Sequence, residues 1–154
     1  MKAAIFTIST SMYKTGGESI TATRITEILE ESGFEICGVK ALPSERQVIS
    51  TVLKQLSDSN TVDLILTLGA NGHTKSECAP DAVTDIVDRV LPGISEAMRA
   101  YNLNFSDRAM LDRSVAGICN NTLIVNLPNK EKAATEDLDY ILSELIHVID
   151  TIAL

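Results

Sequence analysis

The sequence has 154 residues, 45% of them hydrophobic and 22% charged, which is the composition of a single globular domain spanning 1–154. Its formal net charge of −8, from 21 acidic and 13 basic residues, excludes general attraction to nucleic acid or to an anionic membrane. The three cysteines, Cys37, Cys78 and Cys119, lack C-x-x-C spacing, so neither a disulfide framework nor a structural zinc site is expected.

The first part of the chain alternates predicted strands and helices. Residues 3–8 form a short continuous apolar run, which is typical of a strand buried on both faces. Residues 19–32 have the apolar spacing of a helix, and Gly33 predicts its end. Residues 34–42 predict a second strand that Pro43 ends.

The middle of the chain continues this alternation. Ser44 and Gln47 have the Ser-x-x-Gln spacing of a capping box, which predicts a helix to about Ser57. Residues 63–68 form the most hydrophobic predicted strand, and it leads directly into the loop Gly69-Ala70-Asn71-Gly72.

Two further helices are predicted after this loop. Val83, Ile86, Val87 and Val90 have helical spacing, which predicts a helix over residues 81–91. Pro92-Gly93 is expected to break it before a short helix that runs through Met98.

The end of the chain predicts a hairpin and a long helix. Short strands at 114–118 and 122–126 flank Asn120-Asn121, residues that tolerate the positive φ of a tight turn. The clearest apolar stripe lies over 133–152 and predicts the last helix. The order of these elements predicts a three-layer α/β fold with a mostly parallel sheet and one antiparallel hairpin.

The candidate site lies at the carboxyl ends of the predicted strands, because open α/β sheets bind ligands at that edge. Four segments follow strand ends: 9–17, 42–44, 69–81 and 127–132. Glycines at both ends of the 69–72 loop allow close approach of an anion, although a tight turn without ligand has the same pattern.

Charged residues flank these loops. Asp81 follows Pro80 at a predicted helix start, where it is either a simple helix-start residue or a magnesium ligand. Lys130 and Lys132 follow the last strand, where they either hold a terminal phosphate or belong to a solvated loop. His73 and Cys78 have no third ligand or base, which disfavours a metal or nucleophile role.

Five segments appear in an order that is specific to one family. They are 63–72, 79–82, 92–99, 109–117 and 122–128. Over nearly its whole length the chain resembles the molybdopterin adenylyltransferase family (Mog/MoaB-like proteins). The resemblance implies a trimeric α/β protein that binds molybdopterin and, in the adenylyltransferase members, joins AMP from Mg-ATP to its terminal phosphate.

The resemblance and the loop analysis together give the expected site residues. Asp81 is the expected metal ligand and a catalytic residue, and Glu45 is a second catalytic candidate. The expected ligand-binding residues are Ser9, Gly69, Ala70, Asn71, Gly72, Glu96, Arg99, Pro128, Asn129, Lys130 and Lys132. Mg²⁺ and ATP are the implied cofactors of an active enzyme, and a pterin phosphate is the implied small-molecule partner.

The chain departs from the family pattern at four places. The family's Gly-Gly-Thr-Gly loop has Ala70 and Asn71 in the middle, and its Ser-Asp after the first strand is Ser9-Thr10. Ser44 replaces an acidic residue after Pro43, with Glu45 as a possible substitute. The family's Pro-Gly-Ser-Pro loop is Pro128-Asn129-Lys130-Glu131.

These departures leave three hypotheses open. The first is an adenylyltransferase, the second is a non-catalytic module that binds a pterin phosphate or nucleotide, and the third is a nucleotide pyrophosphatase. The resemblance implies a homotrimer or higher homo-oligomer. The cysteine usage favours a cytoplasmic location, and the net charge disfavours nucleic-acid partners. No membrane partner is expected, because no apolar run approaches the roughly 18 residues of a membrane helix.

Overall fold

The centre of the molecule is a six-stranded sheet with the strand order β2-β1-β3-β6-β5-β4, as seen in a computed structural model of residues 1–154. The strands are β1 (Lys2–Ile8), β2 (Glu35–Leu42), β3 (Leu64–Leu68), β4 (Arg89–Val90), β5 (Ala116–Cys119) and β6 (Thr122–Leu127). The neighbours β2, β1, β3 and β6 pair in parallel, whereas β5 is antiparallel to both β6 and β4. The expected mostly parallel sheet with an antiparallel hairpin is confirmed.

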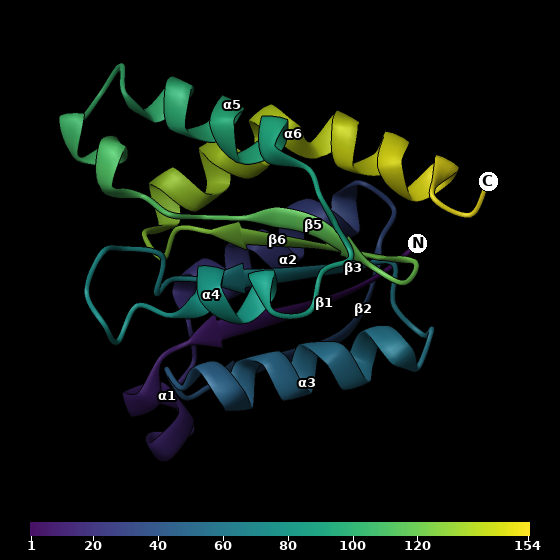
Figure 1. The fold of residues 1–154 in the computed structure, drawn as a ribbon, viewed down its shortest axis with the longest axis horizontal. Coiled ribbons are helices and arrows are strands. Elements are labelled where there is room, and N and C mark those ends of the chain that lie inside the picture. Colours follow the sequence, from purple (N-terminus) through teal and green to yellow (C-terminus); the bar gives the residue numbers. More distant parts are fainter.

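Helices cover both faces of this sheet (Figure 1). The first face is covered by α2 (Ile20–Glu31), α5 (Pro92–Asn102) and α6 (Glu131–Thr151), and the second by α3 (Arg46–Asp58) and α4 (Ala79–Thr84). Successive strand side chains point to opposite faces, so Ala3 and Ile5 join one core while Ala4 and Phe6 join the other. The three-layer α/β architecture is therefore confirmed.

No helix combines the length and the apolar character that crossing a membrane would require.

The prediction of a helix over 81–91 is wrong beyond its first turns. Helix α4 ends at Thr84, and residues 89–90 form β4, which pairs with β5. A Cβ atom on Gly117 of β5 would lie 2.8 Å from the carbonyl oxygen of Arg89 and 3.0 Å from Cγ1 of Val87. Strand pairing across the sheet thus determines this segment, and the absence of a side chain at Gly117 permits it.

The Gly117→Ala variant is expected to lower the free energy of unfolding by about 1–3 kcal/mol, because its methyl group would push β4 away from β5. Urea denaturation followed by circular dichroism measures the change. Gly38→Ala is the matched control, since a Cβ atom on this β2 glycine would meet nothing within 4 Å. Equal stability of the two variants would contradict the close packing of β4 on β5.

The capping-box prediction at Ser44 is also wrong. Helix α3 begins at Arg46, and its N-cap residue Glu45 makes no side-chain cap. The Ser44 hydroxyl instead donates to the carbonyl oxygen of Ser76, in the loop that follows β3. Ser44 therefore ties two loops of the carboxyl edge together.

Other element boundaries also differ from the predicted ones. Helix α1 (Thr10–Thr15) follows β1, where only a loop was expected, and Ser9 caps it by accepting from the Met12 amide at 3.3 Å. Helix α5 starts at Pro92 and extends to Asn102, beyond the expected short helix, and the 3₁₀ helix η1 (Asp107–Leu111) follows it. Cys37 is exposed on β2, the strand at one end of the sheet, whereas Cys78 and Cys119 are buried.

Candidate functional site

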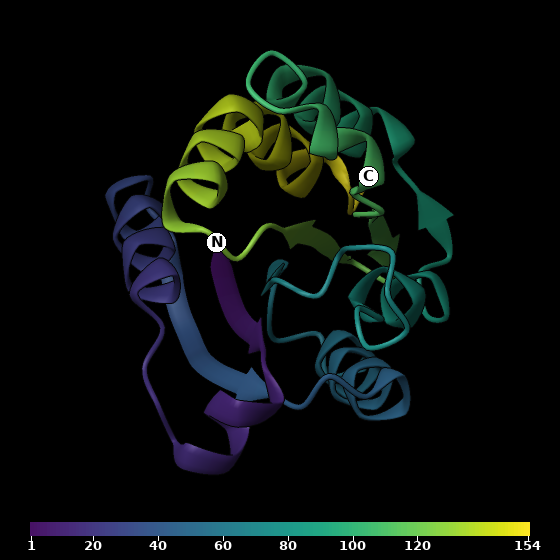
Figure 2. The same cartoon turned by 90° about the vertical axis from the view of Figure 1, so that its left-hand side faces the viewer.

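The loops that follow β1, β2, β3 and β6 meet at the carboxyl edge of the sheet. In Figure 1 the arrowheads of β1 and β6 point to this edge, and Figure 2 looks onto it. The Ser9 amide donates to the carbonyl oxygen of Leu42 at 2.9 Å, and the Gly69 amide donates to that of Leu127 at 2.9 Å. The convergence of the four predicted segments is therefore present.

The glycine loop after β3 packs tightly against the loop after β6. Gly69 has a φ of 90°, and a Cβ atom there would lie 3.1 Å from Cβ of Asn129. The carbonyl oxygen of Asn129 accepts from the Thr21 hydroxyl at 2.7 Å, so helix α2 braces the same loop. Ala70 also adopts a left-handed conformation, with a φ of 61°. The two loops form one rigid corner.

Asn71 lies at the centre of this corner. Its side-chain amide donates to the carbonyl oxygen of Leu127 at 2.8 Å, which fixes the orientation of the amide group. The backbone carbonyl oxygen of Asn71 accepts from the backbone amide of Arg113 at 2.8 Å. The side-chain oxygen Oδ1 is buried and has no hydrogen-bond partner. An unpaired buried acceptor is costly, so its place in this corner favours a ligand or water partner.

Two carboxylates flank the glycine loop, and only Asp81 was predicted from the sequence. Asp81 forms an ion pair with Arg113, whose Nη2 lies 2.6 Å from Oδ2 of Asp81, and Oδ1 stays free. Glu77, which was missed, accepts from the amides of Gly72 and Thr74 at 3.2 Å and from the Thr74 hydroxyl at 2.7 Å. The Thr74-x-x-Glu77 spacing was the available signal.

These hydrogen bonds keep Glu77 ionised. The Thr74 hydroxyl, followed by the two loop amides, lowers the pKa of the Glu77 carboxyl below its ordinary value. Glu77 thus supplies a fixed negative charge beside the glycine loop over the whole neutral range.

A cavity of about 450 Å³ adjoins this corner, between α5, η1 and the start of α6. Four of the expected ligand-binding residues line it: Arg99, Pro128, Lys130 and Lys132. Arg108 adds another positive charge, and neither it nor the two lysines form a salt bridge. Three carboxylates, Asp112, Glu136 and Asp137, also line the cavity, so its four basic residues leave an excess of one positive charge. Unpaired cations in a cavity are suited to binding phosphate.

Arg99 has a partly structural position in the same cavity. Its Nη1 donates to the carbonyl oxygen of Ser114 at 3.1 Å and lies 3.5 Å from Oδ2 of Asp112. Glu96 and Glu45, by contrast, are exposed, and neither lines this cavity. The structure therefore brings Arg99 and the Pro128–Lys132 loop together, but leaves Glu96 and Glu45 outside the group.

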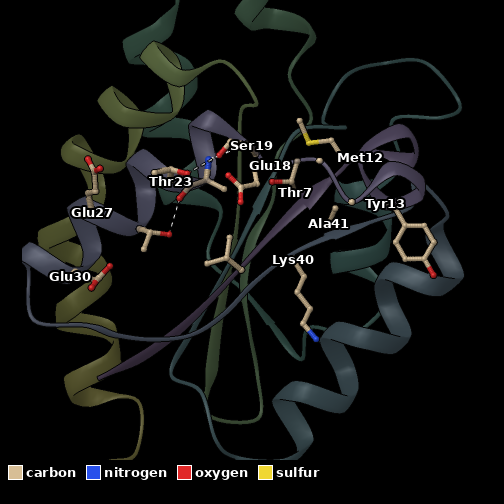
Figure 3. Close-up of a pocket in the computed structure, with 15 residues that line it drawn as sticks. Thr7, Met12, Tyr13, Glu18, Ser19, Thr23, Glu27, Glu30, Lys40 and Ala41 are labelled. Carbon is tan, nitrogen blue, oxygen red and sulfur yellow. Dashed lines mark hydrogen bonds between the residues drawn. The ribbon is translucent and has the colours of Figure 1, made fainter.

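A larger cavity of about 670 Å³ lies elsewhere, between α1, α2 and β2 (Figure 3). Three glutamates line it, Glu18, Glu27 and Glu30, with Lys40 as its one basic residue. None of the expected ligand-binding residues lines this larger cavity. Its negative charge disfavours phosphate, so the smaller basic cavity is the better candidate for an anionic ligand.

Magnesium would have to bind through few protein ligands. No group of three or more His, Cys, Asp or Glu side chains is arranged to hold a metal ion. Magnesium in phosphate-transfer sites is commonly bound by one or two carboxylates together with waters and substrate phosphates. Asp81, whose Oδ1 accepts no hydrogen bond, and Glu77 beside the glycine loop are the candidate carboxylates.

Comparison with known proteins agrees with this geometry. A family model described as a probable molybdopterin binding domain matches residues 4–147. The chain is 40% identical over 100 residues to the molybdopterin adenylyltransferase of Haemophilus influenzae, covering 65% of this chain and 51% of that protein. It is 31% identical over 138 residues to that of Helicobacter pylori, covering 88% of this chain and 78% of the relative.

A solved structure extends the likeness to three dimensions. The crystal structure of the molybdopterin biosynthesis enzyme MoaB from Thermus thermophilus superposes with a TM-score of 0.86 at 33% identity, covering 97% of both chains. The chain thus spans about half the length of the Haemophilus protein but nearly all of the Thermus one.

Proposed function

This chain belongs to the molybdopterin-binding domain family, and on that premise we propose that it binds molybdopterin at the carboxyl edge of its sheet and adenylylates it with Mg-ATP. The observation that carries the proposal is the contact of Gly69 with Asn129, which joins the glycine loop to the basic cavity. A nucleotide and a second phosphate-bearing ligand can then be held side by side.

The reaction would be an adenylyl transfer. An oxygen of the molybdopterin phosphate attacks the α-phosphorus of ATP, a new P–O–P linkage forms, and the bond to the β-phosphate breaks to release pyrophosphate. Such a transfer needs positioning and neutralisation of charge rather than a covalent nucleophile. Lys130 and Lys132 would hold the attacking phosphate. The Gly69 and Gly72 amides already donate to Leu127 and Glu77, so the amides of Ala70 and Asn71, which donate to no acceptor of the chain, would face the phosphates of ATP.

Carboxylates at the loop would complete the site. Bound magnesium would neutralise the phosphates of ATP, and Glu77 and Asp81 are the residues that would hold it. Arg113 orients Asp81 through their ion pair and is itself fixed to Asn71 by its backbone amide. Asp81 is therefore positioned from the same loop that would bind the nucleotide.

Incubation of the purified chain with molybdopterin and Mg-ATP tests the proposal, with mass spectrometry for adenylylated molybdopterin. We expect the product, and we expect Lys132→Ala to raise the KM for molybdopterin about tenfold by removing a phosphate contact. Lys2→Ala is the matched control, because Lys2 is exposed where β1 begins, away from the carboxyl edge.

The other outcomes separate the alternatives. Binding of molybdopterin without product would favour a non-catalytic module, which the replacements at Ser44 and Ala70 would explain. Release of AMP without adenylylated product would favour a nucleotide pyrophosphatase. Binding of neither ligand would contradict the proposal and the module alike.

We also propose a cytoplasmic homotrimer. The three free cysteines suit a reducing compartment, and the trimer is the assembly that the family resemblance implies. Light scattering on the purified chain measures the assembly, and a monomer would contradict it.

A further inference from the structure

A buried carboxylate faces the basic cavity without a cation. Asp137 on α6 is 2% exposed, lines the cavity, and takes part in no salt bridge. Its only donor is the side-chain amide of Asn102 on α5, whose nitrogen lies 2.9 Å from one carboxylate oxygen and 3.1 Å from the other.

This arrangement is unfavourable for the protein alone. A carboxylate removed from water is usually paired with a cation, but the nearest charged neighbours that affect Asp137 are Asp112 and Glu136, which have the same sign. Burial, with these two charges, raises its pKa to about 6. Unpaired buried charges of this kind are found where a ligand supplies the missing partner.

The carboxylate retains free acceptor positions. Two carboxylate oxygens offer about four lone pairs, and the single Asn102 nitrogen is shared between them. A ligand with two adjacent N–H groups can therefore bind both oxygens at once, as a planar donor fork does.

An aromatic side chain at the same cavity favours a planar ligand. Phe105 lines the cavity and is 71% exposed, which is unusual for an aromatic ring. A flat heterocycle can stack on such a ring. The cavity thus combines a stacking face, a hydrogen-bond acceptor and, at Lys130 and Lys132, positive charge.

We propose that Asp137 determines the specificity of this cavity for a pterin, by accepting hydrogen bonds from the N3–H and 2-amino groups of the ring. This inference rests on the proposed function and deepens it. The same 2-amino-4-oxopyrimidine edge occurs in guanine, whereas a lumazine has an oxygen in place of the 2-amino group. The ligand's phosphate would then extend towards Lys130 and Lys132.

Three small probes test the proposal on the intact chain: 6-hydroxymethylpterin, 6-hydroxymethyllumazine and GMP. Ligand-observed NMR titration at pH 7.5 measures their affinities. We expect the pterin to bind at least about tenfold more tightly than the lumazine, because the lumazine leaves a buried acceptor unpaired. Asp137→Asn should reduce pterin affinity about tenfold to a hundredfold and abolish the preference.

Control variants separate recognition from structure. Asp139→Asn changes an exposed carboxylate on the same helix and should alter neither the pterin affinity nor the lumazine affinity. Lys132→Ala removes a cation from the same cavity and should leave the preference for pterin over lumazine intact. A structural role of Asp137 would lower the Tm and weaken the binding of all probes equally. A recognition role instead weakens pterin binding more than lumazine binding and leaves the Tm undiminished.

Other results would overturn the inference. An unchanged ratio of pterin to lumazine affinity in Asp137→Asn, GMP binding that Asp137→Asn does not weaken, or no pterin binding at all would each do so. If adenylylated product forms but Asp137→Asn leaves the ratio of pterin to lumazine affinity unchanged, the role of Asp137 is overturned and the proposed adenylyl transfer is not. A retained pterin preference without any adenylylated product would overturn adenylyl transfer and leave Asp137 as the recognition residue.

Discussion

Glu77→Gln is expected to lower adenylyl transfer about 100-fold while leaving the fold intact. Glutamine has nearly the same shape and can still accept from the Thr74 hydroxyl, but it has no charge for magnesium. It also cannot accept from the amides of both Gly72 and Thr74 with two oxygens, so the loop loses one of its ties. Loss of charge and of loop geometry at a phosphate site each reduces turnover strongly.

Steady-state kinetics at saturating Mg-ATP measures this effect, with the Tm as a check on folding. Glu18→Gln is the control, because Glu18 lines the acidic cavity near α1 and not the glycine loop. Raising the magnesium concentration should partly restore the activity of Glu77→Gln if the metal site is weakened. Activity within a factor of two of the unmodified protein would assign the metal site to Asp81 and not to Glu77.

Asp137→Asn is expected to stabilise the protein, and the gain should grow with pH. Burial raises the pKa of Asp137 from 3.8 to about 6, so the folded chain holds this proton in a pH range where the unfolded chain releases it. The contribution of Asp137 to stability is therefore fully present below pH 3.8 and is lost as pH rises through about 6. Asparagine does not titrate and escapes that loss.

Urea denaturation at several pH values measures the difference between the two proteins. A shift of about two pKa units corresponds to at most about 3 kcal/mol, and solvent in the cavity that Asp137 lines reduces this to about 1–2 kcal/mol at pH 7.5. Near pH 4 most of this gain should have disappeared. A gain that does not change between pH 4 and pH 7.5, or a loss of stability at pH 7.5, would show that the charge is compensated in the folded protein. Asp139→Asn should show neither effect, since that carboxylate is exposed.

Gain of stability and loss of pterin recognition in one variant would have a common cause. A carboxylate that a ligand must complete is costly while the ligand is absent, so removing it favours the free protein. A residue with a purely structural role would not show this opposition.

The sequence predicted the elements whose pattern is local. Strands β1 and β3 are continuous apolar runs buried on both faces, and α6 has an uninterrupted apolar stripe, so each could be recognised without knowledge of its neighbours. Strand β4 could not, because residues 89–90 pair with β5 only where Gly117 leaves space. Helical spacing of the apolar residues after Asp81 was misleading there.

The meeting of the strand-end loops at the candidate site was predictable, but the contacts within it were not. The rule that parallel strands present their loops at one edge correctly brought together Ser9, Gly69 and the Pro128 loop. The ion pair of Asp81 with Arg113 joins residues 32 positions apart, and no local pattern indicates it. Asp137 lies at helical spacing from Ala134 and Ile141 on the apolar face of α6, so its burial could have been predicted. Its contact with Asn102, 35 positions away, could not.

A crystal structure of the chain with bound molybdopterin tests the central claim most directly. The terminal phosphate is predicted to lie at Lys130 and Lys132, and the pterin ring is predicted to reach the Asp137 carboxylate in the cavity between α5, η1 and α6. Molybdopterin bound instead in the acidic cavity between α1, α2 and β2, with the basic cavity free of ligand, would contradict the proposed site.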